Sequence, residues 1–213
     1  MVHSTLFPPM AGPTILTPEF FYRDPLSCAR DLIGREFVCG DCSGILLETE
    51  AYCEIGDPAC HLFTRPSART FALRHEPGTA YVYLNYGIHW LANVLCRDHH
   101  TGEAGFVLFR ALEAVSGIES MSHRRGTTDR LRLCSGPGKL TAALGIDGRF
   151  HGRSLASVPE FCLREPSQPR RFTLLADRRI GISAGKDLPW RFLAQDHPGV
   201  SVKAPGPATR STR

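Results

Sequence analysis

The sequence predicts an α+β fold with mainly antiparallel strand pairing, and three observations support this class. Residues 44–52 alternate between two faces, residues 81–84 and 88–95 form two β-rich runs joined by a short turn, and strand patterns recur without a helix between each pair. A chain of 213 residues is long enough to bury one core without a metal or disulfide. We therefore expect a single domain, with helices flanking the sheet and a protruding β-hairpin.

The two ends of the chain differ from its centre in composition. Residues 1–17 and 195–213 are rich in Pro, Gly, Ser and Thr and have little periodic apolar content. We expect a loose N-terminal segment over 1–17 and a flexible C-terminal tail over 195–213. The domain itself is expected to occupy residues 18–194.

The first predicted helix runs from Asp24 to Leu32. Asp24 suits the N-cap position, Pro25 suits the first helical position, and Gly34 ends the helical pattern. A strand over residues 44–52 is expected to follow this helix.

That strand places two carboxylates and a tyrosine on one face. Glu48, Glu50 and Tyr52 share the parity of Leu46, which is the period of a β-strand. Two interpretations of the glutamates remain open. They could form the solvated face of an edge strand, or they could be charges held in an apolar strand for a chemical purpose.

Residues 81–84 and 88–95 predict a hairpin connected by Asn85, Tyr86 and Gly87. Tyr86 is then expected near the tip, where an exposed aromatic ring is unusual. Such a ring could fill the gap that an extruded base leaves in a base stack.

Arg110 lies in the next predicted strand, over residues 105–112, among apolar neighbours. A charged side chain in this setting needs a partner or a use. One interpretation is a structural ion pair with Glu113, Glu48 or Glu50. The other is a functional site, because an arginine, a carboxylate and a set of aromatic rings suit an enzyme that acts on an extruded nucleobase.

The basic segment over residues 123–132 contains a single acidic residue. It is either a solvated charged loop or a ridge of phosphate contacts beside the Gly-Pro-Gly-Lys turn at 136–139. This turn also opens a predicted helix toward Leu144. Later strands are expected near 171–175 and 179–182.

The composition bounds the function class. The 25 basic residues are 22 Arg and three Lys, against 21 acidic residues, which favours gripping anions over Schiff-base chemistry. The most apolar stretch, 81–96, is shorter than the roughly 20 residues of a spanning helix. Residues 1–17 lack the pattern of an export signal. We therefore expect no membrane segment, and reduced thiols for the eight cysteines.

Five groups of motifs follow one another along the chain. They are Glu48-Thr49-Glu50-Ala51-Tyr52 with Asp57-Pro58-Ala59-Cys60-His61, then Tyr81-Val82-Tyr83-Leu84-Asn85-Tyr86-Gly87, Asn93-Val94, Leu108-Phe109-Arg110-Ala111-Leu112-Glu113 and Gly136-Pro137-Gly138-Lys139-Leu140. Together they resemble the 3-methyladenine DNA glycosylase family of the mammalian alkyladenine type. The resemblance extends from about Phe20 to Phe192. It implies one domain around a curved antiparallel sheet that excises damaged bases without a cofactor or metal.

The resemblance implies catalytic roles for two residues. Glu50 would activate a water for attack on C1′ of a flipped nucleotide, and Arg110 would hold that water and the nearby sugar-phosphate. One carboxylate suits this reaction, because an N-alkylated purine already carries positive charge and leaves without a second acid. No lysine lies within the motifs assigned to the pocket, so we expect an abasic product without strand cleavage.

The resemblance also implies contacts with the base. Tyr52 would stack on one face of the base, and His61 and Tyr83 on the other. The main chain of His61 would test the base edge, and Asn93 would disfavour a normal guanine.

Further residues are expected to contact the duplex. Tyr86 and Ile88 would enter the base stack. The remaining expected DNA contacts are Tyr81, Arg65, Arg69, Arg124, Arg125, Gly136 and Lys139. The sequence departs from the family pattern over residues 62–76, which replace a Gly-containing, Arg-rich run, and Arg65, Arg69 and Arg74 could supply the missing phosphate contacts.

The expected partner is double-stranded DNA that contains damaged purines, namely 3-methyladenine, 7-methylguanine, hypoxanthine or ethenoadenine. We expect a cytoplasmic monomer without an obligatory protein partner, associated with the nucleoid if the source is bacterial. An alternative is a non-catalytic binding module for distorted DNA, stabilised by zinc. Cys39-Gly40-Asp41-Cys42 has the spacing of a zinc knuckle, with Cys53, Cys60 and His61 downstream.

Overall fold

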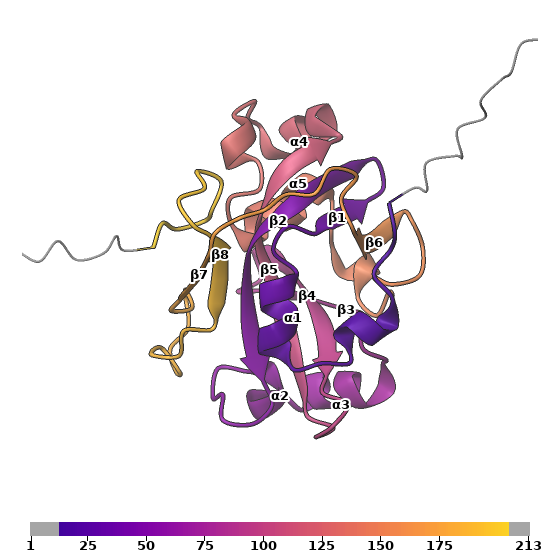
Figure 1. The fold of residues 1–213 in the computed structure, drawn as a ribbon, viewed down its shortest axis with the longest axis vertical. Helices are drawn as coiled ribbons and strands as arrows, with labels where there is room; N and C mark the ends of the chain where they lie inside the picture. The colour runs from indigo at the N-terminus through magenta and orange to yellow at the C-terminus, as the bar shows by residue number, and fades with distance from the viewer. Residues whose placement is uncertain (1–12, 205–213) are drawn as a thin grey trace, which may run out of the picture.

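A computed structural model describes residues 13–204 and has the predicted α+β class. Within that range, eight strands form one curled antiparallel sheet in the order β3-β4-β5-β2-β1-β6, and β8 pairs with both β2 and β7 (Figure 1). The strands are β1 Glu36–Cys39, β2 Cys42–Cys53, β3 Ala80–Asn85, β4 His89–Arg97, β5 Ala104–Ser116, β6 Phe161–Arg164, β7 Leu174–Asp177 and β8 Arg191–Ala194. The helices are α1 Pro25–Asp31, α2 His61–Thr64, α3 Pro66–Arg74, α4 Ile118–Arg125 and α5 Pro137–Leu144, and short 3₁₀ turns span Pro18–Phe21, Arg130–Arg132 and Gly148–Phe150.

Helix α1 forms where the sequence predicts it. The Asp24 carboxylate accepts a hydrogen bond from the Ser27 amide at 2.9 Å, which caps the helix, and Pro25 occupies the first turn. Cys28 and Ala29 are buried against the sheet. The Thr49 hydroxyl of β2 donates to the Ala29 carbonyl at 2.8 Å, so a polar contact fixes the helix on the strand that carries the two glutamates.

The pairing of β2 with β5 has irregular register at the centre of the molecule. Glu48 pairs with Ala111 and Thr49 pairs with Phe109, so Arg110 has no partner opposite it. Such a bulge turns the extra residue toward a new direction. As a result, Arg110 points to the same side of the sheet as Glu48 and Glu50 and forms ion pairs with both.

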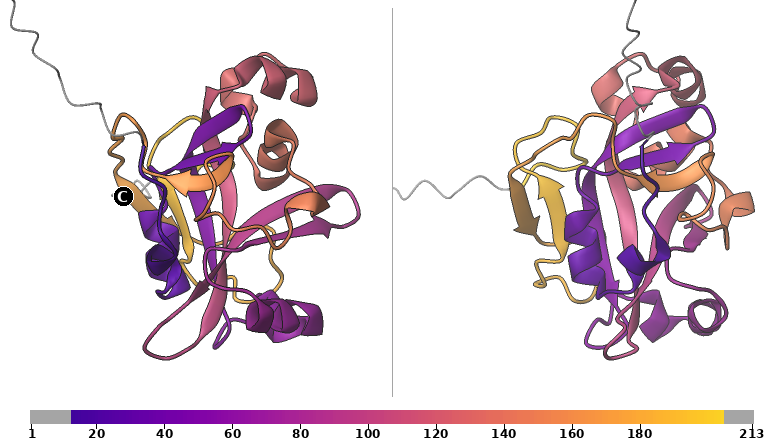
Figure 2. Two further views of the ribbon diagram at one scale, coloured as in Figure 1. Left: turned by 90° about the vertical axis from the view of Figure 1, so that its right-hand side faces the viewer. Right: turned by 45° about the vertical axis from the view of Figure 1, so that its right-hand side comes forward.

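The predicted hairpin is confirmed as β3 and β4. Their register runs from Ala80 opposite Val94 to Asn85 opposite His89. Tyr86 has a φ of 49°, a left-handed conformation that is uncommon outside glycine, and it is 87% exposed. The hairpin projects from the body of the molecule in the left view of Figure 2.

Two of the later predictions need correction. Residues 179–182 do not form a strand, because the Arg179 side chain turns inward to an ion pair with Asp57. The last strand is instead β8, which lies between β2 and β7. The strand expected near 171–175 begins at Leu174.

Several elements were absent from the prediction. They are β1, β6, α2, α3 and α4, and α4 occupies the first part of the basic segment that was expected as a loop or a ridge. Gly117 and Gly126 have φ values of 67° and 62° and bound α4 at its two ends.

The chain on either side of the expected domain takes part in the packing. Ile15 forms a bridge to Arg164, and Leu16 is buried. At the other end Val200 is buried, and Ser201 forms hydrogen bonds with Glu48. The domain boundaries at 17 and 195 stay predictions, and residues 1–12 and 205–213 of the expected loose ends lie outside the described residues. Over residues 13–204, no helix has both the length and the apolar character that crossing a membrane requires.

Candidate active site

A fully buried carboxylate, Glu50, lies at the centre of the sheet. Its Oε1 accepts a hydrogen bond from the Ile180 amide at 2.7 Å, and its Oε2 accepts one from the Tyr52 hydroxyl at 2.8 Å. The Arg110 Nη1 lies 3.2 Å from the same Oε2. The interpretation of Glu48 and Glu50 as a solvated face is therefore wrong, because both side chains have 0% exposure.

Glu48 forms a second buried carboxylate site behind Arg110. Its Oε1 accepts hydrogen bonds from Arg110 Nε at 2.9 Å and from Arg191 Nε at 2.8 Å. Burial disfavours the charge, but the two guanidinium groups outweigh burial and lower the pKa of Glu48. Arg110 thus pairs with both strand glutamates, and Glu113 contacts Arg170 and His197 instead.

Tyr52 forms one wall of the cavity in front of Glu50. Burial and the negative charge of Glu50 raise the pKa of Tyr52 well above its usual range, so the hydroxyl remains a hydrogen-bond donor. The Arg179 guanidinium lies 4.7 Å from the centre of the Tyr52 ring. Arg179 in turn binds Asp57 through two hydrogen bonds of 2.6 and 2.8 Å, both between buried groups. This ion pair fixes the end of β2 to the loop that carries Ile180.

His61 and Tyr83 also line the cavity and lie against each other. Their ring centroids are 4.6 Å apart, and Nδ1 of His61 lies 3.2 Å from the hydroxyl of Tyr81. Burial, followed by the charge of Arg65, lowers the pKa of His61 to about 4. The imidazole is therefore neutral at neutral pH and presents an uncharged ring to the cavity.

Asn93 also lines the cavity and is buried. Its Nδ2 donates to the carbonyl of Tyr81 at 3.1 Å, which fixes the orientation of the amide. The amide oxygen and the second N–H hydrogen remain for a molecule in the cavity.

The cavity has a volume of about 810 Å³ and extends from these walls to the rim of the molecule. It is bounded by Tyr52, His61, Tyr83, Asn93, Arg110 and Tyr86, among other residues. The structure therefore brings the predicted base-pocket residues, Arg110 and the hairpin tip to a single hollow, with Glu50 directly behind Arg110 and Tyr52.

Residues 136–139 and Arg125 also line the cavity, and their contact with phosphates stays a prediction. A Cβ added at Gly138 would lie 3.0 Å from Cβ of His89, so His89 would have to shift by a few tenths of an ångström. Lys139 also lines the cavity, although the motifs assigned to the base pocket contain no lysine.

Three of the arginines expected to contact DNA donate hydrogen bonds within the protein. Arg125 donates from Nε to the Leu133 carbonyl at 3.0 Å. Arg124 donates to the Ala143 carbonyl at 2.7 Å and to the Cys42 sulfur at 2.8 Å. Arg69 donates to the Leu62 carbonyl at 2.9 Å. Arg65 lies instead on the cavity wall, with its guanidinium 5.5 Å from the centre of the Tyr83 ring. A DNA contact of Arg69 or Arg124 stays a prediction.

Several residues of the site escaped the sequence analysis. Ile180 and Ser201 contact Glu50 and Glu48 from positions about 130 and 150 residues further along the chain, and no local pattern marks them. His89 lines the rim and follows directly from the hairpin register, so its position was accessible to prediction.

The two cysteines with the spacing of a zinc knuckle, which belong to the alternative interpretation, occupy the β1–β2 hairpin. Cys39 pairs with Cys42 across a two-residue turn. In the described part of the chain, no group of three or more His, Cys, Asp or Glu side chains is arranged to hold a metal ion. The CxxC spacing here belongs to a hairpin turn.

Comparisons with known proteins match this architecture. The family model described as methylpurine-DNA glycosylase matches residues 19–198. A protein of Agrobacterium fabrum is 46% identical over 185 residues, which cover 87% of this chain and 91% of the relative. A protein of Rhodopseudomonas palustris is 42% identical, with 92% of each chain covered, and one of Chlorobium luteolum is 41% identical, with 90% of this chain and 99% of the relative covered. All three carry the name "Putative 3-methyladenine DNA glycosylase". The chain belongs to the methylpurine-DNA glycosylase family.

Proposed function

We propose that this DNA glycosylase extrudes an alkylated or deaminated purine from duplex DNA and hydrolyses its N-glycosidic bond, leaving an abasic site. The observation that carries the proposal is the buried Glu50 carboxylate, bound by Arg110 and Tyr52 at the back of a cavity with aromatic walls. The relatives' names support 3-methyladenine as one substrate. The other proposed bases are 7-methylguanine, hypoxanthine and ethenoadenine.

Glu50 acts as the general base in the proposed reaction. Among residues 13–204, its Oε1 accepts a single hydrogen bond, from Ile180, which leaves one lone pair for a water. Glu50 takes a proton from this water, and the water oxygen forms a bond to C1′ of the nucleotide. The C1′–N bond breaks and its electron pair passes to the base. Arg110 orients Glu50 and the water and interacts with the sugar-phosphate.

The residues that line the cavity select the base in two ways. Aromatic rings stack on its faces, and polar groups contact its edge. Tyr52 stacks on one face, and His61 and Tyr83 stack on the other. A fixed Asn93 amide disfavours the exocyclic amine of guanine. Cationic 3-methyladenine and 7-methylguanine leave as neutral bases, whereas hypoxanthine and ethenoadenine need a proton from solvent and react more slowly.

The rim and the hairpin engage the duplex in the proposed complex. Tyr86 and Ile88, which are 87% and 72% exposed, enter the space of the extruded base. Arg65, Arg125 and Lys139 contact phosphates, together with the turn at Gly136. We propose that the protein acts as a monomer, since one chain supplies every group named here.

The test compares the wild type with Glu50→Gln on a duplex that contains one hypoxanthine. We expect the single-turnover rate of base release to fall by about 10²- to 10⁴-fold, because the amide cannot take the proton. Binding to the lesion duplex should persist. Undiminished release by Glu50→Gln would contradict the role of Glu50, and no release by the wild type from any of the four lesions would contradict the proposed activity.

A second measurement tests the absence of strand cleavage. Borohydride traps the imine that a lysine forms with the sugar, and Lys139 lines the rim. We expect no trapped complex and strand breakage only after alkali. A complex trapped by the wild type and lost in Lys139→Gln would show that the enzyme is bifunctional.

A further inference from the structure

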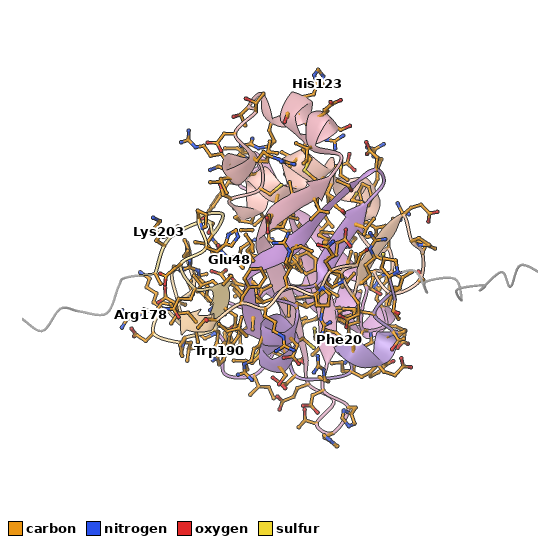
Figure 3. All side chains as sticks on the ribbon, turned by 45° about the horizontal axis from the view of Figure 1, so that its top comes forward. Phe20, Glu48, His123, Arg178, Trp190 and Lys203 are labelled. Atoms are coloured by element: carbon orange, nitrogen blue, oxygen red, sulfur yellow. The ribbon has the colours of Figure 1, made fainter. Side chains whose placement is uncertain are left out.

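The proposed reaction leaves the second buried carboxylate, Glu48, without a part. It has 0% exposure and lies inside the molecule, whereas His123, Arg178 and Lys203 lie at its periphery (Figure 3). A buried carboxylate is costly unless it is paired, and its partners here include the same Arg110 that contacts Glu50. Glu48 is therefore joined to the reaction centre through one guanidinium group.

Three groups fix the Arg110 guanidinium, each at a different nitrogen. Nε donates to Glu48 at 2.9 Å, Nη2 donates to the Ser201 hydroxyl at 3.2 Å, and Nη1 lies 3.2 Å from Glu50. Without the first two contacts, the arginine would be held by Glu50 alone and could rotate about its side-chain bonds. The orientation of Arg110 toward Glu50 thus depends on contacts behind it.

Ser201 brings the C-terminal segment into this arrangement. Its amide and its hydroxyl donate to the two oxygens of Glu48 at 2.6 and 2.8 Å, and the hydroxyl also accepts from Arg110. The segment is secured on both sides of Ser201, because Val200 is buried and the Val202 carbonyl accepts a hydrogen bond from Arg191. Arg191 itself donates to Glu48 at 2.8 Å.

We propose that Glu48 and Ser201 are positioning residues for the glycosylase reaction. They hold Arg110 against Glu50, so the C-terminal segment over 197–202 completes the reaction centre from behind. This inference rests on the proposed function and assigns a part in it to a segment that does not line the cavity.

The fold contains a matched control for this arrangement. Near the other end of β2, the Ser43 hydroxyl donates to the buried Glu36 at 2.6 Å, and Arg164 donates to Glu36 at 2.9 Å. Serine, buried glutamate and arginine recur there, but Glu36 pairs with no residue that contacts Glu50. Loss of a serine hydroxyl should therefore cost stability at both places and catalysis at only one.

The experiment compares Ser201→Ala, Ser201→Thr and Ser43→Ala with the wild type. Rates of hypoxanthine release are measured with enzyme in excess over DNA, so that binding and product release do not limit them. We expect Ser201→Ala to be slower by roughly three- to tenfold, the scale of one lost hydrogen bond. Ser201→Thr, which keeps the hydroxyl, and Ser43→Ala should stay within about twofold of the wild type.

The conservative variant separates positioning from a loss of stability. The Ser201 hydroxyl contacts both Arg110 and Glu48, so Ser201→Thr should restore the single-turnover rate that Ser201→Ala loses. Ser43→Ala should keep the rate of the wild type. Thermal unfolding of both alanine variants shows whether their stability losses are alike.

The outcomes distinguish this inference from the proposed function. Wild-type protein that releases no base contradicts the proposed function. If the wild type is active, an unchanged rate in Ser201→Ala overturns the positioning role. Equal rate losses in Ser201→Ala and Ser43→Ala overturn it as well. Glu48→Gln, where it folds, should lose more rate than Ser201→Ala, and a folded Glu48→Gln with wild-type rate would overturn the assignment of Glu48.

Discussion

The reaction centre and the hairpin tip belong to one sheet but have opposite environments. Glu48 and Glu50 have 0% exposure, and their oxygens are occupied by hydrogen-bond donors from several segments. Tyr86 is 87% exposed, and Ile88 beside it is 72% exposed. The difference follows from the tasks proposed for them, because a general base must be held still and away from bulk water, whereas a residue that enters a duplex must stand free of its own protein.

The largest effect on stability is expected from removing one charge of a buried ion pair near the reaction centre. Arg179→Met leaves Asp57 buried without its partner, and we expect the free energy of unfolding to fall by about 3–5 kcal/mol. Chemical denaturation measures the loss. The neighbouring Arg178 forms an exposed ion pair with Asp187, so Arg178→Met should cost less than about 1 kcal/mol. Equal costs for the two variants would mean that the buried ion pair does not stabilise the fold.

Substitutions at the exposed hairpin tip should change the affinity for DNA and leave the free energy of unfolding unchanged. Tyr86→Ala removes a ring with few contacts in the protein, so its unfolding should match the wild type. Its affinity for a duplex with one ethenoadenine should fall by about 1–3 kcal/mol, the scale of one stacked ring. Titration by fluorescence anisotropy measures this change. Tyr86→Phe keeps the ring and serves as the control, and a loss as large as that of Tyr86→Ala would assign the effect to the hydroxyl.

Lys139 is neither fully buried nor on the hairpin tip, and its substitution should change how DNA affinity depends on salt concentration. Lys139 lines the cavity, and Lys139→Gln should reduce the slope of log affinity against log salt concentration by about 1. Lys186 is exposed away from the cavity lining, so Lys186→Gln serves as the matched control with an unchanged slope. Identical slopes for both variants would remove Lys139 from the phosphate contacts.

The smallest expected effect is a titration in the cavity wall. The pKa of His61 is about 4 in the folded protein and near 6.5 in an unfolded chain, so this residue binds fewer protons when folded. Its contribution to stability is full above about pH 6.5 and is lost as the pH falls toward 4. An NMR titration should give His61 a midpoint near 4, and a midpoint near 6.5 would contradict a desolvated ring.

Elements with local signals were predictable from the sequence. The Asp24 cap, the hairpin around Tyr86 and the turn before α5 each depend on residues close in the chain, and each is found where it was expected. The alternation of Glu48 and Glu50 also gave their shared face. The alternation could not reveal their burial, because an edge strand and a central strand of a sheet have the same period. Strand β2 is central, with β1, β5 and β8 as its neighbours.

Contacts between distant segments could not be predicted. The bulge that turns Arg110 toward both glutamates arises from register between β2 and β5. Arg179 and Ile180 have the alternation of a strand, yet Arg179 folds inward because Asp57 is buried more than 120 residues earlier. Ser201 lies in a segment whose composition is typical of a tail, and its use depends on the position of Glu48.

The burial of the cysteines has a consequence for the chemical setting in which such a protein works. Burial raises the pKa of Cys39 to about 11 and those of Cys53, Cys60 and Cys134 to about 12. The thiolate is the form that attacks electrophiles, and at neutral pH these groups are almost entirely protonated. Reagents that methylate purines also methylate thiolates. Under the proposed function, these thiols therefore stay unreactive during the exposure that creates the proposed substrates.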